Sequence, residues 1–200
     1  VTGVTCERET FLGANVVVCA GAMSRSLLKS AGISVPQYFT HAELIETPPL
    51  DIKLRSLVMP ANAQRFKLEA TSSTVELAPL WDEPGHEPIL PILDAGAVQL
   101  IDGTLRIGQV SRTLTDPNAA IDRAASEQAM RTQVGAILPA LKGLPGTWHH
   151  CLIAFSRDSL PLVGSIADIE NIHLFSGFSN PLAIVPPLAR RFAQAAIAGT

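Results

Sequence analysis

Cysteine is scarce in this sequence, and neither sign of charge is in large excess. Three cysteines occur among 200 residues, Cys6, Cys19 and Cys151, and no two of them form a C-x-x-C pair. Their odd number and wide spacing argue against a disulfide framework and predict reduced thiols in a cytoplasmic protein. The net charge is −3 and no stripe of lysine and arginine is present. Nucleic acid is therefore not an expected partner.

Long hydrophobic runs and glycine-rich loops are also missing. Spanning a bilayer takes about 20 apolar residues, and Arg190 and Arg191 interrupt the apolar C-terminal stretch. The first residues, Val-Thr-Gly-Val, include no initiator methionine and no basic segment, so we expect no signal peptide and a chain that begins inside a longer protein. The sequence has no G-x-G, no G-x-x-x-x-G-K-[ST] and no G-x-S-x-G. These absences argue against a dinucleotide fingerprint, a P-loop or a serine-hydrolase elbow within the chain.

What is present first is a strand, turn and helix over residues 14–33. Three consecutive valines, 16–18, predict a buried strand, and 47% apolar residues are ample for a core. Ala20, Gly21 and Ala22 form a turn almost without side chains, which lets a ligand approach the backbone closely. Ser24 is the expected N-cap of a short helix that Gly32 closes. Such a unit is typical of cofactor sites in α/β folds.

The middle of the chain has a different pattern. Pro36 breaks the α/β pattern, and alternation at period two predicts strands over 38–46, 55–59 and 74–80. Asp102-Gly103 predicts an antiparallel hairpin with a two-residue type I′ turn.

A helical repeat follows the hairpin. Asp116 is its expected cap, Pro117 its first residue and Leu138 its last apolar position, and a strand is expected over 148–155. The adjacent pair His149-His150 lies on that strand, where neighbouring side chains face opposite sides, so we expect no metal site there.

The C-terminal tail resembles the first segment in kind. A strand over 172–175 leads into a turn at Ser176-Gly177 and then a helix, whose free N–H groups suit an anionic group. The ends are thus α/β-like and the middle antiparallel. We predict an α+β fold in which an antiparallel domain, 36–154, is inserted between two parts of one α/β domain, 1–35 and 155–200.

The order of the segments carries a resemblance. "VTGV", "ANVVVCAGAMSRSLLKSAGI", "GTLRIGQ", "LPAL", "RDSLPLVG" and "SGFSNPLAIVPPLARRFAQAAIAG", in this order, are similar to the C-terminal part of the D-amino-acid-oxidase-like flavoenzymes, with the glycine oxidase and sarcosine oxidase branch nearest. The resemblance implies oxidation of an amine or amino-acid C–N bond by hydride transfer to FAD. It also implies that the glycine-rich pyrophosphate loop is encoded upstream, in an N-terminal FAD-binding segment. The ends of the chain would then be the remnant of the FAD-binding domain and the middle the substrate domain.

The resemblance assigns residues to each role. The cofactor-binding candidates lie in the two turns: Ala20, Gly21, Ala22, Ser24, Gly177, Phe178, Ser179, Asn180 and Leu182. The substrate-pocket candidates lie on the central sheet: His41, His150 and Ile153. No catalytic side chain is assigned.

Departures from the family pattern keep the function open. Relatives usually read Trp-x-Gly-x-Arg-Pro where this chain reads His149 to Ala154, so Ile153 stands in place of a carboxylate-binding arginine, which an aliphatic side chain cannot replace. Pro181 removes one backbone donor from the second turn. A neutral or apolar amine is therefore the expected substrate. The alternative is a truncated, non-catalytic relative that acts as a binding or assembly module. A nicotinamide dehydrogenase fits poorly, because the fingerprint is absent and the middle is antiparallel.

The valine strand has a further consequence. Without sheet neighbours its edge would invite pairing with a second copy, so the isolated chain is expected to form a homo-oligomer.

Overall fold

The computed structural model describes residues 1–198 and divides into two compact units. Unit 1 consists of Val1–Tyr38 and of the described residues from Ala154 onward, and unit 2 consists of Phe39–Ile153. The second unit thus begins after Tyr38 and ends at Ile153. The sequence predicts an inserted domain over 36–154.

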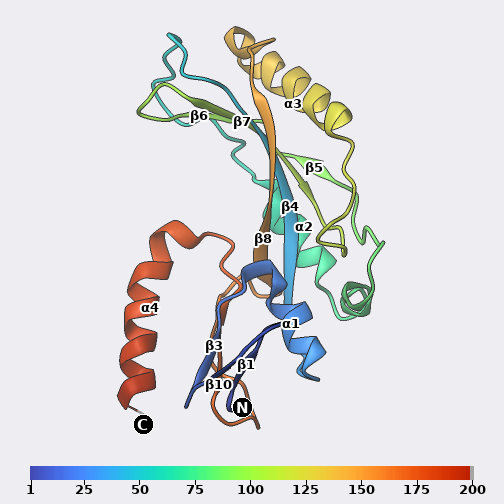
Figure 1. Ribbon diagram of the computed structural model, residues 1–200. Helices are drawn as coiled ribbons and strands as arrows, with labels where there is room; N and C mark the ends of the chain where they lie inside the picture. Colours follow the sequence, from blue (N-terminus) through green and yellow to red (C-terminus); the bar gives the residue numbers. More distant parts are fainter. Residues whose placement is uncertain (199–200) are drawn as a thin grey trace. The chain divides into compact units, whose positions relative to one another are not determined.

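Unit 1 is built on a small mixed sheet. The central strand β10 (Ile172–Ser176) pairs in parallel with β3 (Val16–Val18) and antiparallel with β9 (Leu162–Ser165) (Figure 1). A separate two-stranded ribbon joins β1 (Gly3–Thr5) to β2 (Thr10–Leu12), and the helices are η1 (Gly21–Met23), α1 (Ser24–Ser30) and α4 (Pro181–Ala198). Val18 of β3 and alternate residues of β10 pack against α1 and the segment after it. This core consists of Val18, Leu28, Ile33, Val35, Ile172 and Leu174. The valine run forms the predicted strand, but the strand is not buried throughout, because Val16 is partly exposed and Val17 is exposed.

Unit 2 is built on a five-stranded sheet. Its order is β5-β7-β4-β8, with β6 also on β7, and β7 pairs antiparallel with β4, β5 and β6. The strands are β4 (Gln37–Glu46), β5 (Ile92–Leu93), β6 (Ala97–Gln99), β7 (Leu105–Arg112) and β8 (Thr147–Ser156). The helices are α2 (Gln64–Ser72), η2 (Ala78–Asp82), α3 (Arg123–Ile137) and η3 (Pro139–Leu141).

The core of unit 2 lies between this sheet and α3. Met130 and Val134 of α3, four residues apart and so on one face of the helix, pack with Ile45 of β4 and Ile107 of β7. All four side chains are buried. The predicted fold class, α+β with a mainly antiparallel central sheet, is confirmed.

The hairpin predicted from Asp102-Gly103 is present, but its turn differs from the prediction. The Gly103 N–H donates to the Leu100 carbonyl over 3.0 Å, and the Leu100 N–H donates to the Thr104 carbonyl over 2.8 Å. Gly103 has a φ of +89°, whereas Asp102 is not among the described residues with positive φ. The loop therefore has three residues, 101–103, with glycine in the left-handed position. Asp102 contributes its side chain, which accepts from the Thr104 N–H over 2.9 Å.

Two predicted strands are wrong. Residues 55–59 make a single bridge, between Val58 and Ala97, and residues 74–80 run through a turn into η2. Pro79 fits the first turn of a helix and removes a donor that a strand needs, so it outweighs the short alternation around it. The sequence interpretation also missed α2.

The predicted start of α3 is wrong by about two turns. The cap is Asp122, whose Oδ1 accepts from the Ala125 N–H over 3.0 Å. Asp116, the expected cap, instead accepts from the Asn118 N–H over 2.8 Å. Asp116 and Pro117 thus form a local turn, which uses the same side-chain chemistry as a helix cap.

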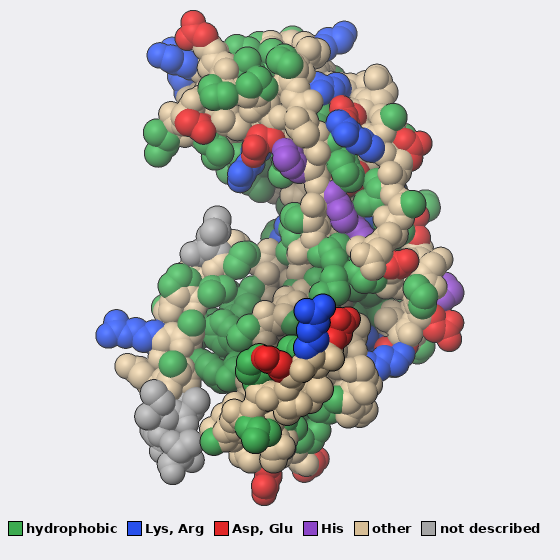
Figure 2. Space-filling model, in the orientation of Figure 1, with side chains coloured by type: hydrophobic (Ala, Val, Ile, Leu, Met, Phe, Trp, Pro, Cys, Tyr) green, Lys and Arg blue, Asp and Glu red, His purple; other side chains and the backbone are tan. Residues whose placement is uncertain are grey.

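On the face seen in Figure 2, basic and acidic side chains lie interspersed. None of the helices in the described part of the chain is long and apolar enough to cross a membrane.

Candidate functional site: a sheet edge and a buried histidine pair

The two turns that the sequence assigns to a cofactor meet at one edge of the unit 1 sheet. Strands β3 and β10 are parallel neighbours, so their carboxyl ends lie at the same edge. The turn 19–24 follows β3, and the turn 177–180 follows β10. A buried hydroxyl pair joins them, because Ser24 Oγ donates to Ser176 Oγ over 3.0 Å and Ser176 Oγ donates to the Gly21 carbonyl over 3.2 Å. The structure therefore brings most of the predicted cofactor residues together.

Ser24 has a different role from the expected one. It is the first residue of α1, the N-cap is Met23, and no side chain caps this helix. The hydroxyl of Ser24 is fully buried and turned to Ser176. A hydrogen bond between the segments after β3 and at the end of β10 thus replaces the predicted helix cap. No cap is needed at this point because the preceding turn forms η1, in which the Met23 N–H donates to the Ala20 carbonyl.

Gly21 leaves the backbone open at this edge. Its φ is +53°, and a Cβ added to it would meet no atom within 4 Å. Ala20 is exposed and Ala22 partly exposed. The turn therefore offers an accessible backbone in a conformation that favours glycine.

A buried polar atom beside Gly21 has no hydrogen-bond partner among the described residues. Gln37 is fully buried and its Nε2 donates to the Gly21 carbonyl, while its Oε1 has no hydrogen bond among the described residues. Leaving a buried acceptor unpaired costs about 1–3 kcal/mol, so such an atom indicates a missing donor. Sequence reasoning did not select Gln37, since it lies next to Pro36 with no motif around it.

The second turn leads directly into α4. Gly177 is buried with a φ of +79°, and the Phe178 ring packs on Phe175 with centroids 4.8 Å apart. Ser179 is partly exposed and Asn180 is exposed. Leu182 is the second residue of α4, and its side chain lies outside the described part of the chain. The turn therefore presents small and polar groups at the start of a helix.

In unit 2, His41 and His150 form a stacked pair. Their ring centroids are 4.9 Å apart, and His41 Nδ1 lies 2.8 Å from His150 Nε2, so one ring donates a proton to the other. His41 is fully buried, and its Nε2 has no hydrogen bond among residues 1–198. The described chain has no cluster of three metal-binding side chains.

Burial keeps this pair neutral. Burial first, and then the charge of His150, lower the pKa of His41 to about 4, although the Asp116 and Leu114 carbonyls and Glu43 oppose the shift. Burial also lowers the pKa of His150, and Glu43 opposes that shift. Glu43 is itself buried, and it accepts from Arg112 Nε over 2.7 Å and from Trp148 Nε1 over 3.0 Å.

Ile153 does not join the histidines. It lies three residues after His150 on β8, so strand alternation places the two side chains on opposite faces. Of the three predicted substrate-pocket residues, the structure thus brings two together. A cavity of about 320 Å³ in unit 2 is lined from β4, β7 and residues 57–66, and its lining includes none of the three.

A second buried titratable group was missed with α2. Glu69 of α2 is buried; its Oε1 accepts from Thr40 Oγ1 over 3.0 Å and lies 3.2 Å from Arg65 Nε. Its Oε2 has no hydrogen bond within the described residues. Burial raises the pKa of Glu69, against the opposing effects of Arg65 and Thr40. The helix-forming run Gln64 to Ala70 was the signal that could have revealed this residue.

The chain can be compared with known families. The family model described as FAD dependent oxidoreductase, DAO, matches residues 1–195. The chain belongs to this family. The resemblance to D-amino-acid-oxidase-like flavoenzymes is therefore confirmed.

Three solved structures, of two oxidases and a dehydrogenase, share the fold. A glycine oxidase from Bacillus cereus ATCC 14579 matches with a TM-score of 0.68 and 17% identity, over 96% of this chain and 45% of that one. An L-proline dehydrogenase from P. horikoshii matches with a TM-score of 0.69 and 17% identity, over 100% and 46%. An iminodiacetate oxidase from Chelativorans sp. BNC1 matches with 0.60 and 15%, over 95% and 44%. The chain thus spans less than half the length of each of these proteins. No curated protein matches it.

Proposed function

We propose that this chain is part of a flavoprotein oxidoreductase that takes hydride from the α-carbon of an amine, which becomes an imine, and that the unit 1 sheet edge contacts its FAD. The observation that carries the proposal is the meeting of the two turns at the carboxyl ends of β3 and β10, beside the unpaired Oε1 of Gln37. Ligands of open α/β sheets bind outside such strand ends. Membership in an FAD-dependent family supports the choice of cofactor.

The residues at this edge fit FAD. Gly21 leaves space for a large ligand against its backbone, and Gln37 Oε1 can accept from a ligand hydroxyl or ring N–H. The N-terminus of α4 carries a positive dipole end that stabilises negative charge. Gly177, Phe178, Ser179 and Asn180 would hold the cofactor from this side. Bound FAD would supply the hydride acceptor.

The substrate we propose is an amine rather than an amino acid, since Ile153 stands where the family pattern has a carboxylate-binding arginine. Ile153 offers no donors, and a carboxylate is bound in proteins by paired N–H donors. His41 and His150 are neutral near pH 7 because burial lowers the pKa of both, so the pair provides no cation in place of an arginine. A glycine-rich loop for the pyrophosphate would come from a segment outside these 200 residues, since the chain has no G-x-G.

The test is the visible absorption spectrum of the protein produced from its intact natural gene. We expect oxidised-flavin bands that bleach when an amine is added without oxygen. A colourless protein that does not bind added FAD would contradict the proposal and favour the alternative, a non-catalytic binding or assembly module.

A matched pair of variants tests the sheet edge itself. Gly21 and Gly32 both have positive φ, +53° and +77°, and both have open space at the Cβ position. The two alanine substitutions therefore cost similar backbone strain. Gly21→Ala should weaken FAD binding about tenfold in a fluorescence titration, equivalent to ~1.4 kcal/mol, whereas Gly32→Ala should leave the Kd unchanged. Equal effects of the two would place the cofactor elsewhere.

A further inference from the structure

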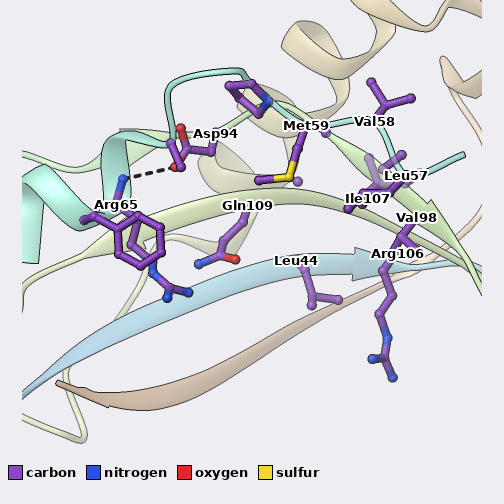
Figure 3. Close-up of a pocket in the computed structure, with 16 residues that line it drawn as sticks. Leu44, Leu57, Val58, Met59, Arg65, Asp94, Val98, Arg106, Ile107 and Gln109 are labelled. Carbon is purple, nitrogen blue, oxygen red and sulfur yellow. Dashed lines mark hydrogen bonds between the residues drawn. The ribbon is translucent and has the colours of Figure 1, made fainter. Parts of the chain in front are cut away.

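The cavity in unit 2 has an apolar wall on every contributing element. Leu44 comes from β4, Val98 from β6 and Met59 from the segment between β4 and α2 (Figure 3). Phe66 comes from α2. Met59 and Phe66 are 57% and 48% exposed, so two large apolar side chains beside the cavity are open to solvent. The volume, about 320 Å³, lies at the lower end of the range of small-molecule sites, about 300–1,000 Å³. The space therefore suits a compact apolar group.

The charged groups around this cavity are already paired within the protein. Arg65 lies 3.2 Å from Glu69, and Arg106 Nε lies 2.9 Å from Glu46. Both oxygens of Asp94 accept backbone N–H groups at the start of α2, over 2.9 and 3.1 Å. A charged ligand would thus enter an apolar space in which no lining residue has a charge left to pair with it, and its desolvation cost would be high. The lining favours a neutral ligand.

One acceptor in the lining is uncommitted. Gln109 of β7 donates from Nε2 to Ser111 Oγ over 3.0 Å, and no hydrogen bond engages its Oε1 within the described residues. A single polar group in an apolar cavity fixes the orientation of a ligand that carries one donor. The donor that matches a carbonyl oxygen is an N–H or O–H.

We propose that this cavity binds the alkyl or aryl body of a neutral amine, with the amine N–H on Gln109 Oε1. The assignment of an amine rests on the proposed function, whereas the apolar body and the single donor rest on the cavity. This names the substrate class as arylalkyl- or alkylamines rather than amino acids. Leu44, Met59 and Gln109 are then specificity-determining residues.

Binding can be measured without any flavin through the methionine methyl groups of the 200-residue chain. The chain has three methionines: Met59 lines the cavity, Met130 is in the core of unit 2, and Met23 is in unit 1. With ¹³C-methyl methionine and Met59 assigned from Met59→Leu, the probes are benzyl alcohol, benzylamine and benzoate. We expect the Met59 resonance to shift saturably with benzyl alcohol while Met23 stays in place. Benzoate should bind at least about tenfold more weakly because its charge is not compensated.

The pH dependence for benzylamine and two substitutions complete the test. Benzylamine should bind more tightly as pH rises from about 7 to about 9, since its neutral fraction grows. Gln109→Leu should weaken benzyl alcohol about 2- to 10-fold, the effect of one hydrogen bond. Leu44→Phe should abolish saturable binding, whereas Leu90→Phe, at a residue 78% exposed outside the lining, should not.

The outcomes separate this proposal from the proposed function. An unmoved Met59 resonance, or benzoate binding as tight as benzyl alcohol, would overturn the cavity assignment even if the protein is a flavoenzyme. An unchanged affinity for benzyl alcohol in Gln109→Leu would overturn the role of Gln109. This result does not depend on whether the Leu44→Phe variant folds. A colourless protein whose Met59 resonance still shifts would leave the apolar site standing and remove the redox role.

Discussion

The His41–His150 pair holds one proton between two ring nitrogens 2.8 Å apart. A second proton would place two positive charges on stacked rings, one of them fully buried. Burial accordingly lowers the pKa of His41 to about 4 from an ordinary 6.5, with the charge of His150 as the second cause. Protonation of this pair therefore opposes folding.

The free energy of unfolding should fall as pH decreases from about 6.5 to about 4. The unfolded chain binds the His41 proton near 6.5 and the folded chain near 4, so in this window the unfolded state holds more protons and stability rises with pH. The loss of stability begins below about pH 6.5 and reaches ~3 kcal/mol at most near pH 4, since each pH unit in this window contributes about 1.4 kcal/mol. Urea unfolding near pH 7 and near pH 5 measures it.

Substitution separates this pair from the other titrating groups. His41→Phe keeps a ring and removes the titration, so the pH slope should become smaller. His149→Phe, at an exposed neighbour of His150, should keep the wild-type slope. If His41→Phe and the wild type show the same slope, the His41–His150 pair is not the source.

At the residue scale, the sequence was informative where a residue's role depends on its own backbone conformation. Gly21 and Gly177 were selected for their turns, and both have positive φ. Gln37, Glu69 and the contact between His41 and His150 could not be predicted, because each depends on a partner between 16 and 109 residues away. No periodicity encodes such a partner.

Among the elements, α2 shows how a helix can depend on a distant residue. Its N-cap, Ala63, provides no side-chain hydrogen bond. Asp94, some 30 residues on, accepts the N–H groups of Gln64 and Arg65 instead. The cap is thus supplied from the segment after β5, and this tie also closes one side of the cavity in unit 2.

Removing this cap should destabilise unit 2 and loosen the cavity. We expect Asp94→Ala to lower the free energy of unfolding by about 1–2 kcal/mol, the usual cost of a lost N-cap carboxylate. Asp51→Ala, at an exposed position, should change it by less than about 0.5 kcal/mol. Chemical denaturation of the three proteins gives both values, and an Asp94→Ala protein as stable as the Asp51→Ala protein would contradict the role of this cap.

The elements were predicted best where one pattern dominated. The valine run gave β3, and Asp-Gly gave the hairpin of β6 and β7. Asp116 was mistaken for Asp122 because an aspartate followed by proline forms either a turn or a helix start. The helix α2 was missed because its cap is not adjacent in sequence.

At the scale of the whole molecule, β3 is an edge strand, since it lies at the end of the order β3-β10-β9. This position has a consequence for self-association. Edge strands with apolar side chains pair with other chains, and Val17 is 41% exposed on this strand. We expect the isolated 200-residue chain to self-associate, and Val17→Lys to raise the concentration of half-association about tenfold. Light scattering over a dilution series measures it, with Leu90→Lys as the control. A wild-type chain that stays a monodisperse monomer would refute the expectation.

The interrupted course of unit 1 also determines the order in which this chain can fold during synthesis. The hydroxyls of Ser24 and Ser176 are joined although the two residues are 152 positions apart, and β3 cannot pair with β10 before residue 176 has left the ribosome. Unit 2 is a continuous segment and is free to fold while the first 38 residues are still without their partners. Bringing such distant strands together is slow. During synthesis, the valine strand β3 therefore stays unpaired until β10 has been made. A chaperone that covers exposed strands would be needed most in this interval.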